Sequence, residues 1–320
     1  MSKFGLWWVT WNGSDYESRM TVGSRIATIG DIISRGFDRV IFLGGEGGAL
    51  DYSGSDYESG YQDGKEFSHW ILSLGGVKYY VAIPFKSPNG QVRGNINKPF
   101  RETYWKGWID GVLSVEDPNR EGFYWALENA WMFHEKQIEM GSGLPIELFE
   151  EISEYIHNLE YKLVWILEYK LVWIPKLGTL YWESSDIKKA KPFVDYIFVQ
   201  PHYYQSPTIP YIEDGVTKEK PYTFDVLKNE YLPITIEKLG VSWEMEADES
   251  VLGHCGNCRE CPGSGIRISS ECTVYASDYM RAQIESKRVF KHLAYYFRTN
   301  FEVLDKLNQY CMENYGGKYI

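Results

Sequence analysis

Carboxylate side chains lie at the ends of two strand-like runs in this sequence. Glu128 follows the run GFYWAL, and the run VSWEMEAD places Glu244, Glu246 and Asp248 on one face by the period-two alternation of a strand. The other face of that second run is apolar, which suits packing beneath helices, so we expect the acidic face to point into a site. Carboxylates this close together repel one another, so the pKa of at least one should rise.

Paired carboxyl groups across a scissile bond are what glycoside hydrolysis requires, because one donates a proton and the other acts as nucleophile or activates water. We predict Glu128 and Glu246 as this catalytic pair, with Glu244 and Asp248 as supporting residues. The alternative is a structural ion pair between an acid of the second run and a basic side chain near another strand end. The basic residues concerned are Lys86, Lys176 and Arg298.

Short apolar runs alternate with longer amphipathic segments along the chain, a pattern typical of βα units. Strands are predicted at Phe4–Trp11, Arg39–Leu43, Lys78–Phe85, Gly122–Leu127, Lys170–Lys176, Tyr196–Gln200, Val241–Ala247 and Leu293–Arg298. Helices are predicted at Arg25–Arg35, Glu66–Leu74, Phe100–Leu113, Ile146–Leu159, Asp186–Ala190, Phe224–Leu239, Ala276–Lys291 and Phe301–Tyr315. Eight such units are what a closed barrel needs, so we predict an α/β fold, a single-domain (β/α)8 TIM barrel over residues 1–320.

A tandem duplication complicates the fifth strand. The octapeptide LEYKLVWI occupies residues 159–166 and again residues 167–174. The repeat is too short for a solenoid, and a recent duplication or an error in the recorded sequence explains it better. We predict the second copy as the strand because Pro175 follows it as a stop signal. The first copy would then extend the preceding helix or bulge out.

Further polar and aromatic residues lie at the predicted strand ends, where barrels of this class carry their chemistry. Amide, hydroxyl and imidazole groups beside aromatic faces are typical of a carbohydrate cleft, and a lone histidine is also often a hydrogen-bonded structural group. The predicted substrate-binding residues, beyond the acids above, are Trp11, Asn12, Glu46, Trp173, Lys176, Gln200, His202 and Tyr204.

A cysteine cluster follows the predicted seventh strand, within a loop insertion over residues 249–273. Cys255, Cys258 and Cys261 have the spacing CxxCxxC, and Cys272 follows eleven residues later, with His254 adjacent to the first. These residues could hold a structural zinc ion, hold an iron–sulfur cluster, or pair as two disulfides that staple the loop. Each of these would be structural. Cys311, on the last helix, is predicted to be a buried free thiol.

Composition excludes several classes of partner. The formal net charge is −11 and no run rich in Lys or Arg occurs, so neither nucleic acid nor an anionic membrane is an expected partner. The 12 Trp, 25 Tyr and 15 Phe residues either fill the core, as in a thermophilic composition, or provide stacking faces for sugars. No signal peptide or membrane span is recognisable, so we expect a cytoplasmic protein, or an extracellular one if the cysteines form disulfides.

A family resemblance spans roughly residues 4–308. The segments GFYWALEN, KLVWIPK, DYIFVQPHYY and GVSWEMEAD, in this order, resemble those of the domain-of-unknown-function family numbered 4855, found in bacteria and archaea. The resemblance implies a TIM barrel with a glycosidase-like site in which Glu128 and Glu246 correspond to the family's strand-end acids. The cysteine-rich insertion is not a feature of that family, so the shape of the mouth should differ here.

The sequence therefore favours a glycoside hydrolase acting on a poly- or oligosaccharide, with a carbohydrate as its partner and no cofactor needed for the chemistry. A non-catalytic carbohydrate-binding barrel is one alternative. A metal-dependent barrel enzyme using the cysteine cluster or His202 is another, although the chain has only six scattered histidines. A zinc ion at the cysteine cluster, if bound, would be structural.

Overall fold

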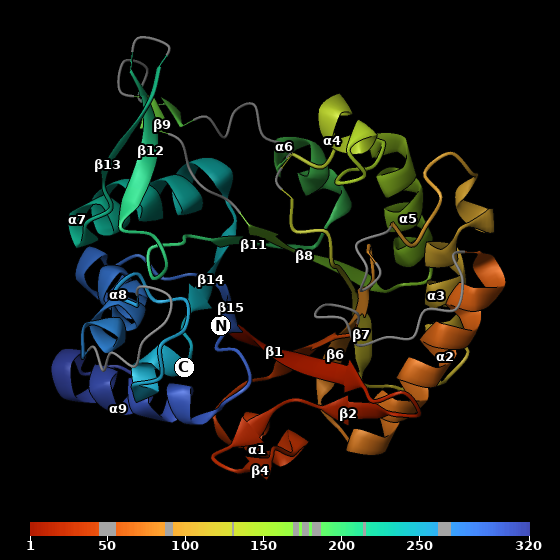
Figure 1. Ribbon diagram of the computed structural model, residues 1–320, viewed down its shortest axis with the longest axis horizontal. Coiled ribbons are helices and arrows are strands. Elements are labelled where there is room, and N and C mark those ends of the chain that lie inside the picture. Colours follow the sequence, from red (N-terminus) through yellow and green to blue (C-terminus); the bar gives the residue numbers. More distant parts are fainter. Residues whose placement is uncertain are drawn as a thin grey trace.

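Eight parallel strands form a closed barrel in the computed structural model, which describes residues 1–44, 56–86, 92–129, 131–168, 173–174, 179–180, 187–213, 216–261 and 270–320. The barrel strands are β1 (Ser2–Trp11), β5 (Arg39–Leu43), β6 (Lys78–Ile83), β7 (Arg120–Trp125), β8 (Lys162–Glu168), β11 (Tyr196–Gln200), β14 (Ser242–Glu246) and β15 (His292–Tyr296). Each pairs with the next in this order, and β15 pairs with β1 to close the ring (Figure 1). The predicted (β/α)8 barrel is confirmed.

Helices surround the ring between successive strands. They are α1 (Ile29–Ser34), α2 (Tyr57–Leu74), α3 (Tyr104–Leu113), α4 (Glu135–Glu139), α5 (Ile146–Asn158), α6 (Ile187–Ala190), α7 (Phe224–Val226), α8 (Ser270–Ser286) and α9 (Glu302–Tyr315). Short 3-10 turns add η1 (Phe100–Glu102), η3 (Lys191–Phe193) and η6 (Glu249–Leu252). The π-helical segments η4 (Leu227–Tyr231) and η5 (Ile234–Leu239) continue α7, so the helix predicted at Phe224–Leu239 forms one unbroken helical run. Helix α2 begins nine residues before the predicted start because the Asp56 side chain caps it by accepting from the Ser59 amide.

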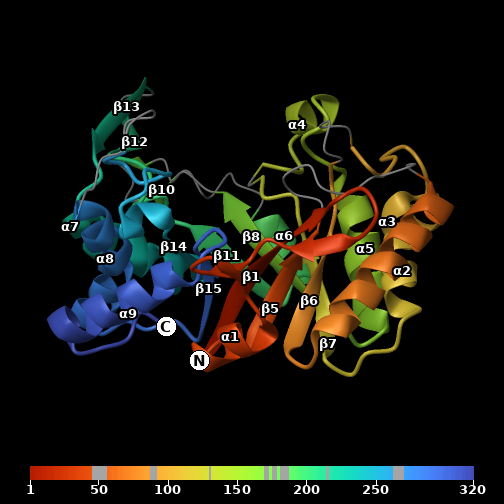
Figure 2. The same cartoon turned by 60° about the horizontal axis from the view of Figure 1, so that its bottom comes forward.

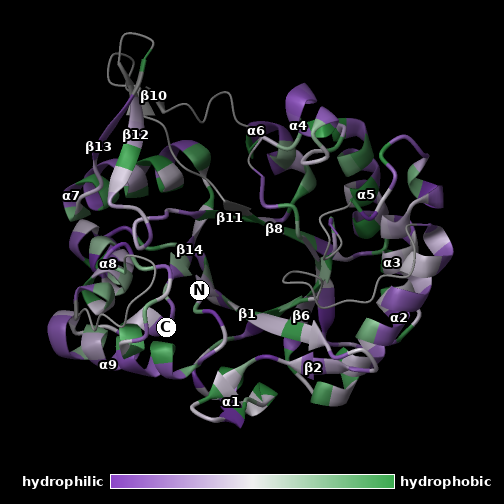
Figure 3. Ribbon diagram, viewed as in Figure 1, coloured by the Kyte–Doolittle hydropathy of each residue, from purple (hydrophilic) through white to green (hydrophobic). Residues whose placement is uncertain are grey.

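Two apolar layers follow from the alternation of side chains along the strands. On β1, Phe4 and Leu6 point into the barrel, whereas Trp7 and Val9 pack outward against the helices. The inner layer also contains tyrosines, among them Tyr80 and Tyr124, so the barrel interior is filled by side chains. Hydrophilic residues gather on peripheral helices such as α4 and α9 (Figure 3).

Helices α2 and α3 approach so closely that only glycine fits at their crossing. A Cβ atom on Gly60 would lie 2.1 Å from the carbonyl oxygen of Tyr104, and one on Gly107 would lie 1.9 Å from that of Tyr57. Because both obstacles are backbone atoms, neither can move aside without separating the helices. The glycines therefore fix the distance between these two helices.

The fifth barrel strand is formed by the first copy of the duplicated octapeptide, so the prediction of residues 170–176 is wrong. Helix α5 ends at Asn158, and β8 begins at Lys162 after a short connection in which Glu160 has a φ of 62°. The two copies have identical intrinsic preferences for strand structure. The first copy forms the barrel strand because it follows α5 after a connection of the usual length for an αβ loop.

The second copy contributes a short strand outside the barrel. Its residues Trp173–Ile174 form β9, which pairs with β10 (Thr179–Leu180) and with Tyr211 of β12 (Thr208–Glu213). Strand β13 (Val216–Pro221) completes this four-stranded sheet. The hairpin of β12 and β13 rises at the end of the barrel where the strands finish, as does α4, whereas the N-terminus lies at the opposite end (Figure 2).

Short strands outside the barrel also change the place of the cysteine-rich segment in the strand count. This segment follows β14, which is the seventh strand of the barrel but comes after seven further strands that lie outside it, among the described residues. Strand β2 (Tyr16–Ser18) extends β1 as a hairpin, and β3 (Thr21–Val22) pairs with β4 (Arg25–Ile26) where a helix start was predicted.

Candidate active site

Glu128 lies just beyond the end of β7 and is half-buried at the mouth of the barrel. Its Oε1 accepts a hydrogen bond from the Tyr124 hydroxyl at 2.5 Å, and its Oε2 accepts one from Nε2 of Gln200 at 3.2 Å. Tyr124 shares the inward face of β7, and Gln200 ends β11, two strands further round the barrel. The carboxylate is thus held across the mouth with part of its surface open to solvent.

Glu246, the last residue of β14, is almost fully buried, with 1% of its surface exposed. Its Oε2 accepts from the His202 amide at 2.7 Å and from the Tyr279 hydroxyl at 2.5 Å, and its Oε1 accepts from Nε2 of Gln205 at 2.7 Å. Burial raises the pKa of Glu246, an effect opposed by the charge of His202 and by these hydrogen bonds. Three donors therefore hold this carboxyl group beneath the segment that follows β11.

His202 adopts a backbone conformation that is uncommon for a residue with a side chain, with a φ of 54°. Its side chain is buried, Nδ1 lies 3.4 Å from Oε1 of Glu246, and Nε2 has no hydrogen-bond partner among the described residues. A strained, buried residue of this kind persists only when its surroundings fix it, and such residues gather at functional sites.

Both predicted catalytic acids contact one segment of chain. Glu128 bonds to Gln200, and Glu246 bonds to His202, two residues further on. The structure therefore brings together Glu128, Gln200, His202 and Glu246, all of which are predicted site residues. Direct contact between Glu246 and a ligand requires the Gln205 side chain to move, because Gln205 occupies Oε1.

The raised pKa of Glu246 makes the stability of the protein depend on pH. The folded state holds a proton on this group more tightly than the unfolded chain, whose carboxyl titrates near 4.5. The contribution of Glu246 to the free energy of unfolding is therefore fully present below pH 4.5. It is lost as the pH rises through the higher pKa of the folded state. Glu246→Gln should remove this part of the decline in urea unfolding free energy between about pH 4 and pH 8. A wild-type-to-variant difference that stays constant over this range would contradict the assignment.

Asp248 and Tyr204 are joined to each other within the wall of the site. Asp248 is fully buried and accepts from the Tyr204 hydroxyl at 2.7 Å, from the Ser250 amide at 2.9 Å and from the Asn257 amide. These bonds link the segment after β11 to the cysteine-rich segment. Glu244 lies one layer deeper on the same face of β14 and is 1% exposed. The geometry gives Asp248 and Tyr204 an anchoring role.

Trp11 and Asn12 do not join this cluster, contrary to the prediction. Trp11 packs edge-on against Tyr16 with ring centroids 4.8 Å apart, on the outward face of β1. Asn12 closes the turn between β1 and β2, where its Oδ1 accepts from the Ser14 and Asp15 amides at 2.9 Å. Period-two alternation from the inward Phe4 excludes Trp11 from the mouth.

Residues predicted at two other strand ends are also displaced or not described. Trp173 lies in β9, outside the barrel, because the other copy of the octapeptide forms the strand. Lys176 and Glu46 lie outside the described residues.

Sequence reasoning missed aromatic residues that do line the barrel. Trp8 on β1 and Tyr296 on β15 pack against the inner layer and meet edge-to-face, with centroids 6.4 Å apart. Burial raises the pKa of Tyr296 to about 12, an effect opposed by Arg298. The same alternation that excludes Trp11 would have identified Trp8.

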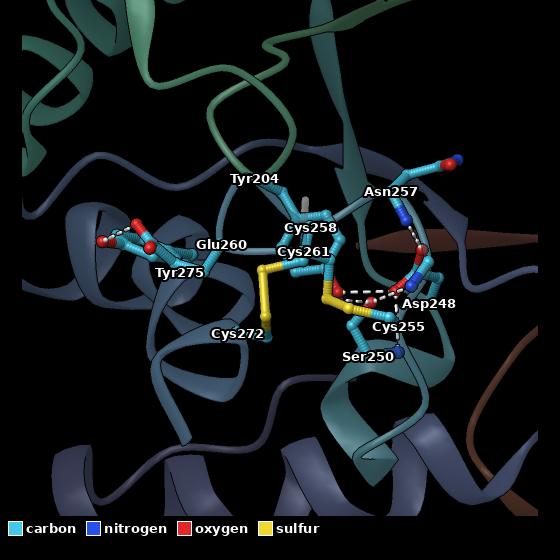
Figure 4. Close-up of a disulfide and its surroundings, with 11 residues drawn as sticks. Tyr204, Asp248, Ser250, Cys255, Asn257, Cys258, Glu260, Cys261, Cys272 and Tyr275 are labelled. Carbon is cyan, nitrogen blue, oxygen red and sulfur yellow. Dashed lines mark hydrogen bonds between the residues drawn. A yellow bond between two sulfur atoms is a disulfide. The ribbon is translucent and has the colours of Figure 1, made fainter. Parts of the chain in front are cut away.

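The four clustered cysteines pair as disulfides, which corrects the zinc and iron–sulfur alternatives. Cys255 bonds to Cys261, and Cys258 bonds to Cys272 at the start of α8 (Figure 4). Sulfur atoms in disulfides are not thiolates and therefore cannot serve as metal ligands. Across the described ranges, no group of three or more His, Cys, Asp or Glu side chains could hold a metal ion. Cys311 is the buried free thiol predicted, and burial raises its pKa to about 12.

The disulfide between Cys258 and Cys272 should contribute most of the cross-linking stability. It spans 14 residues, so the chain-entropy model gives about 3 kcal/mol for the closed loop. We expect the double variant Cys258→Ser/Cys272→Ser to lose about that much unfolding free energy. Cys255→Ser/Cys261→Ser, which opens a span of only 6 residues, should lose less. Equal stability of wild type and both variants under oxidising conditions would contradict this role.

No helix in the described part of the chain is long and apolar enough to cross a membrane.

The fold and the strand-end cluster define the chain as a (β/α)8 barrel with acidic residues at its mouth. A relative matches the chain over nearly its whole length. The chain is 30% identical to "Uncharacterized protein MJ0957" of Methanocaldococcus jannaschii, over 95% of this chain and 90% of that protein. It therefore belongs to the same protein family as MJ0957. No known family profile matches the chain, so its resemblance to family 4855 stays a prediction.

Solved structures with similar folds include carbohydrate-active enzymes. A Group IV chitinase of Ostrinia furnacalis matches 96% of this chain and 99% of its own, with 14% identity and a TM-score of 0.48. A GH113 beta-1,4-mannanase matches 94% of this chain and 88% of its own, with 12% identity and a TM-score of 0.41. Similarity at this level does not extend to activity or to individual site residues.

Proposed function

We propose that this protein is a glycoside hydrolase that cleaves a poly- or oligosaccharide at the C-terminal mouth of its barrel. The observation that carries the proposal is Glu128, a half-buried carboxyl group fixed by Tyr124 and Gln200 at a strand end. Gln200 ends β11 two residues before His202, and the His202 amide in turn binds Glu246 at the end of β14. Two carboxyl groups on one mouth are the minimum that this chemistry needs.

In the proposed mechanism, Glu128 donates its proton to the leaving glycosidic oxygen. Glu246 is the second carboxyl group and acts as nucleophile or activates water. The Gln205 amide would leave Oε1 of Glu246 when the sugar enters, because it now occupies that oxygen at 2.7 Å. Trp8 and Tyr296, both half-buried in the mouth, would stack against the apolar faces of the sugar rings.

A panel of plant, bacterial and animal polysaccharides, incubated with the full chain, tests this proposal. Release of new reducing ends by the wild type, absent with Glu128→Gln, would support it. No release from any polysaccharide by a folded, disulfide-bonded protein would count against it.

A non-catalytic carbohydrate-binding barrel is the second candidate. It is favoured by the burial of Glu246, whose two oxygens already accept hydrogen bonds from three donors. This alternative expects glycan binding that Glu128→Gln leaves unchanged, with no turnover by either protein.

We further propose that the protein works in an oxidising environment, since two disulfides are typical of extracellular proteins and of some hyperthermophiles. Membership of family 4855, with Glu128 and Glu246 as the family's strand-end acids, is part of the same proposal. The supporting residues are those in the segments QPHYY and WEMEAD.

A further inference from the structure

Tyr279, on α8, joins Glu246 to the segment of chain that covers it. The Tyr279 hydroxyl donates to Oε2 of Glu246 at 2.5 Å and accepts from the Tyr204 amide at 3.0 Å. These roles are fixed, because an amide nitrogen can only donate and the hydroxyl proton is therefore directed to the carboxylate. Tyr279 thus links the backbone of residue 204 to the carboxyl group of Glu246.

The ring of Tyr279 is fully buried and is held from two sides. Its centroid lies 5.8 Å from that of Trp243 on β14 and 6.0 Å from that of Tyr203, and both contacts are edge-to-face. Burial and the adjacent charge of Glu246 raise the pKa of Tyr279 well above its usual value, so the hydroxyl keeps its proton. A neutral hydroxyl on a fixed ring can hold the carboxyl group in one orientation.

The two oxygens of Glu246 have different surroundings. Oε2 accepts from the hydroxyl of the buried Tyr279 ring and from the backbone amide of His202 at 2.7 Å. Oε1 accepts from Nε2 of the Gln205 side chain at 2.7 Å, and Gln205 also lines an open polar cavity of about 420 Å³. The Gln205 side chain has room to move, whereas the donors at Oε2 belong to a backbone and to a packed ring. Oε1 is therefore the oxygen that can be freed for a ligand.

We propose that Tyr279 is a positioning residue: together with the His202 amide it holds Oε2 of Glu246 and so presents Oε1 to the substrate. The inference rests on the proposed function, since it assumes that Glu246 takes part in the cleavage. Tyr279 acts through Glu246 and does not itself contact the sugar.

A ¹³C NMR titration of the glutamate carboxyl groups in the disulfide-bonded full chain tests the contact at Oε2 without requiring turnover. The signal of Glu246 is assigned by its absence from Glu246→Gln. Against the larger effect of burial, the hydrogen bond from Tyr279 lowers the pKa of Glu246. Tyr279→Phe keeps the ring but removes this bond, so the midpoint of Glu246 should move to higher pH. An unchanged or lower midpoint would overturn the proposal.

The other ionisable groups around Glu246 stay in place in this variant. They are His202, Tyr222, Tyr319, Glu244 and Asp248. Tyr79→Phe is the matched control, because Tyr79 on β6 is 2% exposed and its hydroxyl also donates to a carboxylate, that of Asp117, at 2.9 Å. The control should leave the midpoint of Glu246 at its wild-type value. An equal movement in both variants would contradict a specific contact.

Carbodiimide labelling of carboxyl groups, read by mass spectrometry, tests which oxygen of Glu246 can be opened. Loss of one hydrogen bond to a charged group should raise the labelling rate of Glu246 in Gln205→Ala by about tenfold. Tyr279→Phe should raise it less, because the phenyl ring still closes the side of Oε2. Glu244, which is 1% exposed, should stay protected in every variant.

Two labelling results would overturn the orientation of Glu246. One is an unchanged rate in Gln205→Ala, and the other is faster labelling in Tyr279→Phe than in Gln205→Ala. If Tyr279→Phe does not fold, the rate in Gln205→Ala still decides.

Kinetics on a glycan that the wild type cleaves separate this inference from the proposed function. Tyr279→Phe should lower kcat by about 10–10²-fold and change KM little, the usual cost of a slightly misplaced reacting group. An unmoved midpoint with kcat intact overturns this inference alone. A moved midpoint, with no glycan cleaved by the wild type, overturns the hydrolase and leaves the orientation of Glu246 standing.

Discussion

Glu128→Gln is expected to reduce kcat/KM on a cleaved glycan by about 10²–10⁴-fold, the usual contribution of a positioned proton donor. The amide cannot donate the proton that the leaving oxygen needs, yet it has the same shape. One of its polar atoms can still accept from Tyr124, which now bonds at 2.5 Å. The thermal unfolding midpoint should therefore change little. Steady-state kinetics and a thermal melt measure the two effects.

Glu135→Gln is the matched control for this variant. Glu135 belongs to α4 in the loop that follows the same strand, but it is exposed. Its replacement should leave both kcat/KM and the melting midpoint unchanged. A glycan that Glu128→Gln cleaves at the wild-type rate would exclude Glu128 as the proton donor.

Glu246→Leu is expected to reduce the unfolding free energy by about 3 kcal/mol or more. Leucine of similar volume leaves the His202 amide, the Tyr279 hydroxyl and the Gln205 amide without an acceptor, all in or beside a buried site. Each buried donor left unsatisfied costs about 1–3 kcal/mol. Urea unfolding monitored by fluorescence measures the loss, and Glu246→Gln should lose less because it retains an acceptor oxygen.

Glu237→Leu provides the comparison on the surface. Glu237 pairs with Arg288 at 2.9 Å and is 56% exposed, so the same substitution there should change stability by at most about 1 kcal/mol. If the two leucine variants lost the same unfolding free energy, the three hydrogen bonds to Glu246 would add nothing to the stability of the protein.

The barrel was predictable because each strand carries its own short-range signal. For example, the period-two alternation along β7 and β14 is enough to predict that Glu128 and Glu246 lie on inward faces. The fifth strand was not predictable in this way, since two identical octapeptides have identical local preferences. Only the short connection from α5 distinguishes them.

The environment of the site depends on contacts between residues far apart in the chain. Glu246 is buried because residues 202–205 fold over it and Tyr279 reaches it from α8, and no pattern around residue 246 reveals either contact. The cysteine spacing likewise fits both metal ligation and disulfides. The choice depends on whether Cys272, at the start of α8, lies against Cys258.

A crystal structure of Glu128→Gln with an uncleaved oligosaccharide tests the central claim most directly. We predict that a glycosidic oxygen lies within about 2.6–3.2 Å of the side chain at position 128, the range for proton transfer. The sugar on one side should lie next to His202, whose amide binds Glu246. An oligosaccharide bound with every glycosidic oxygen beyond reach of residue 128 would contradict the account.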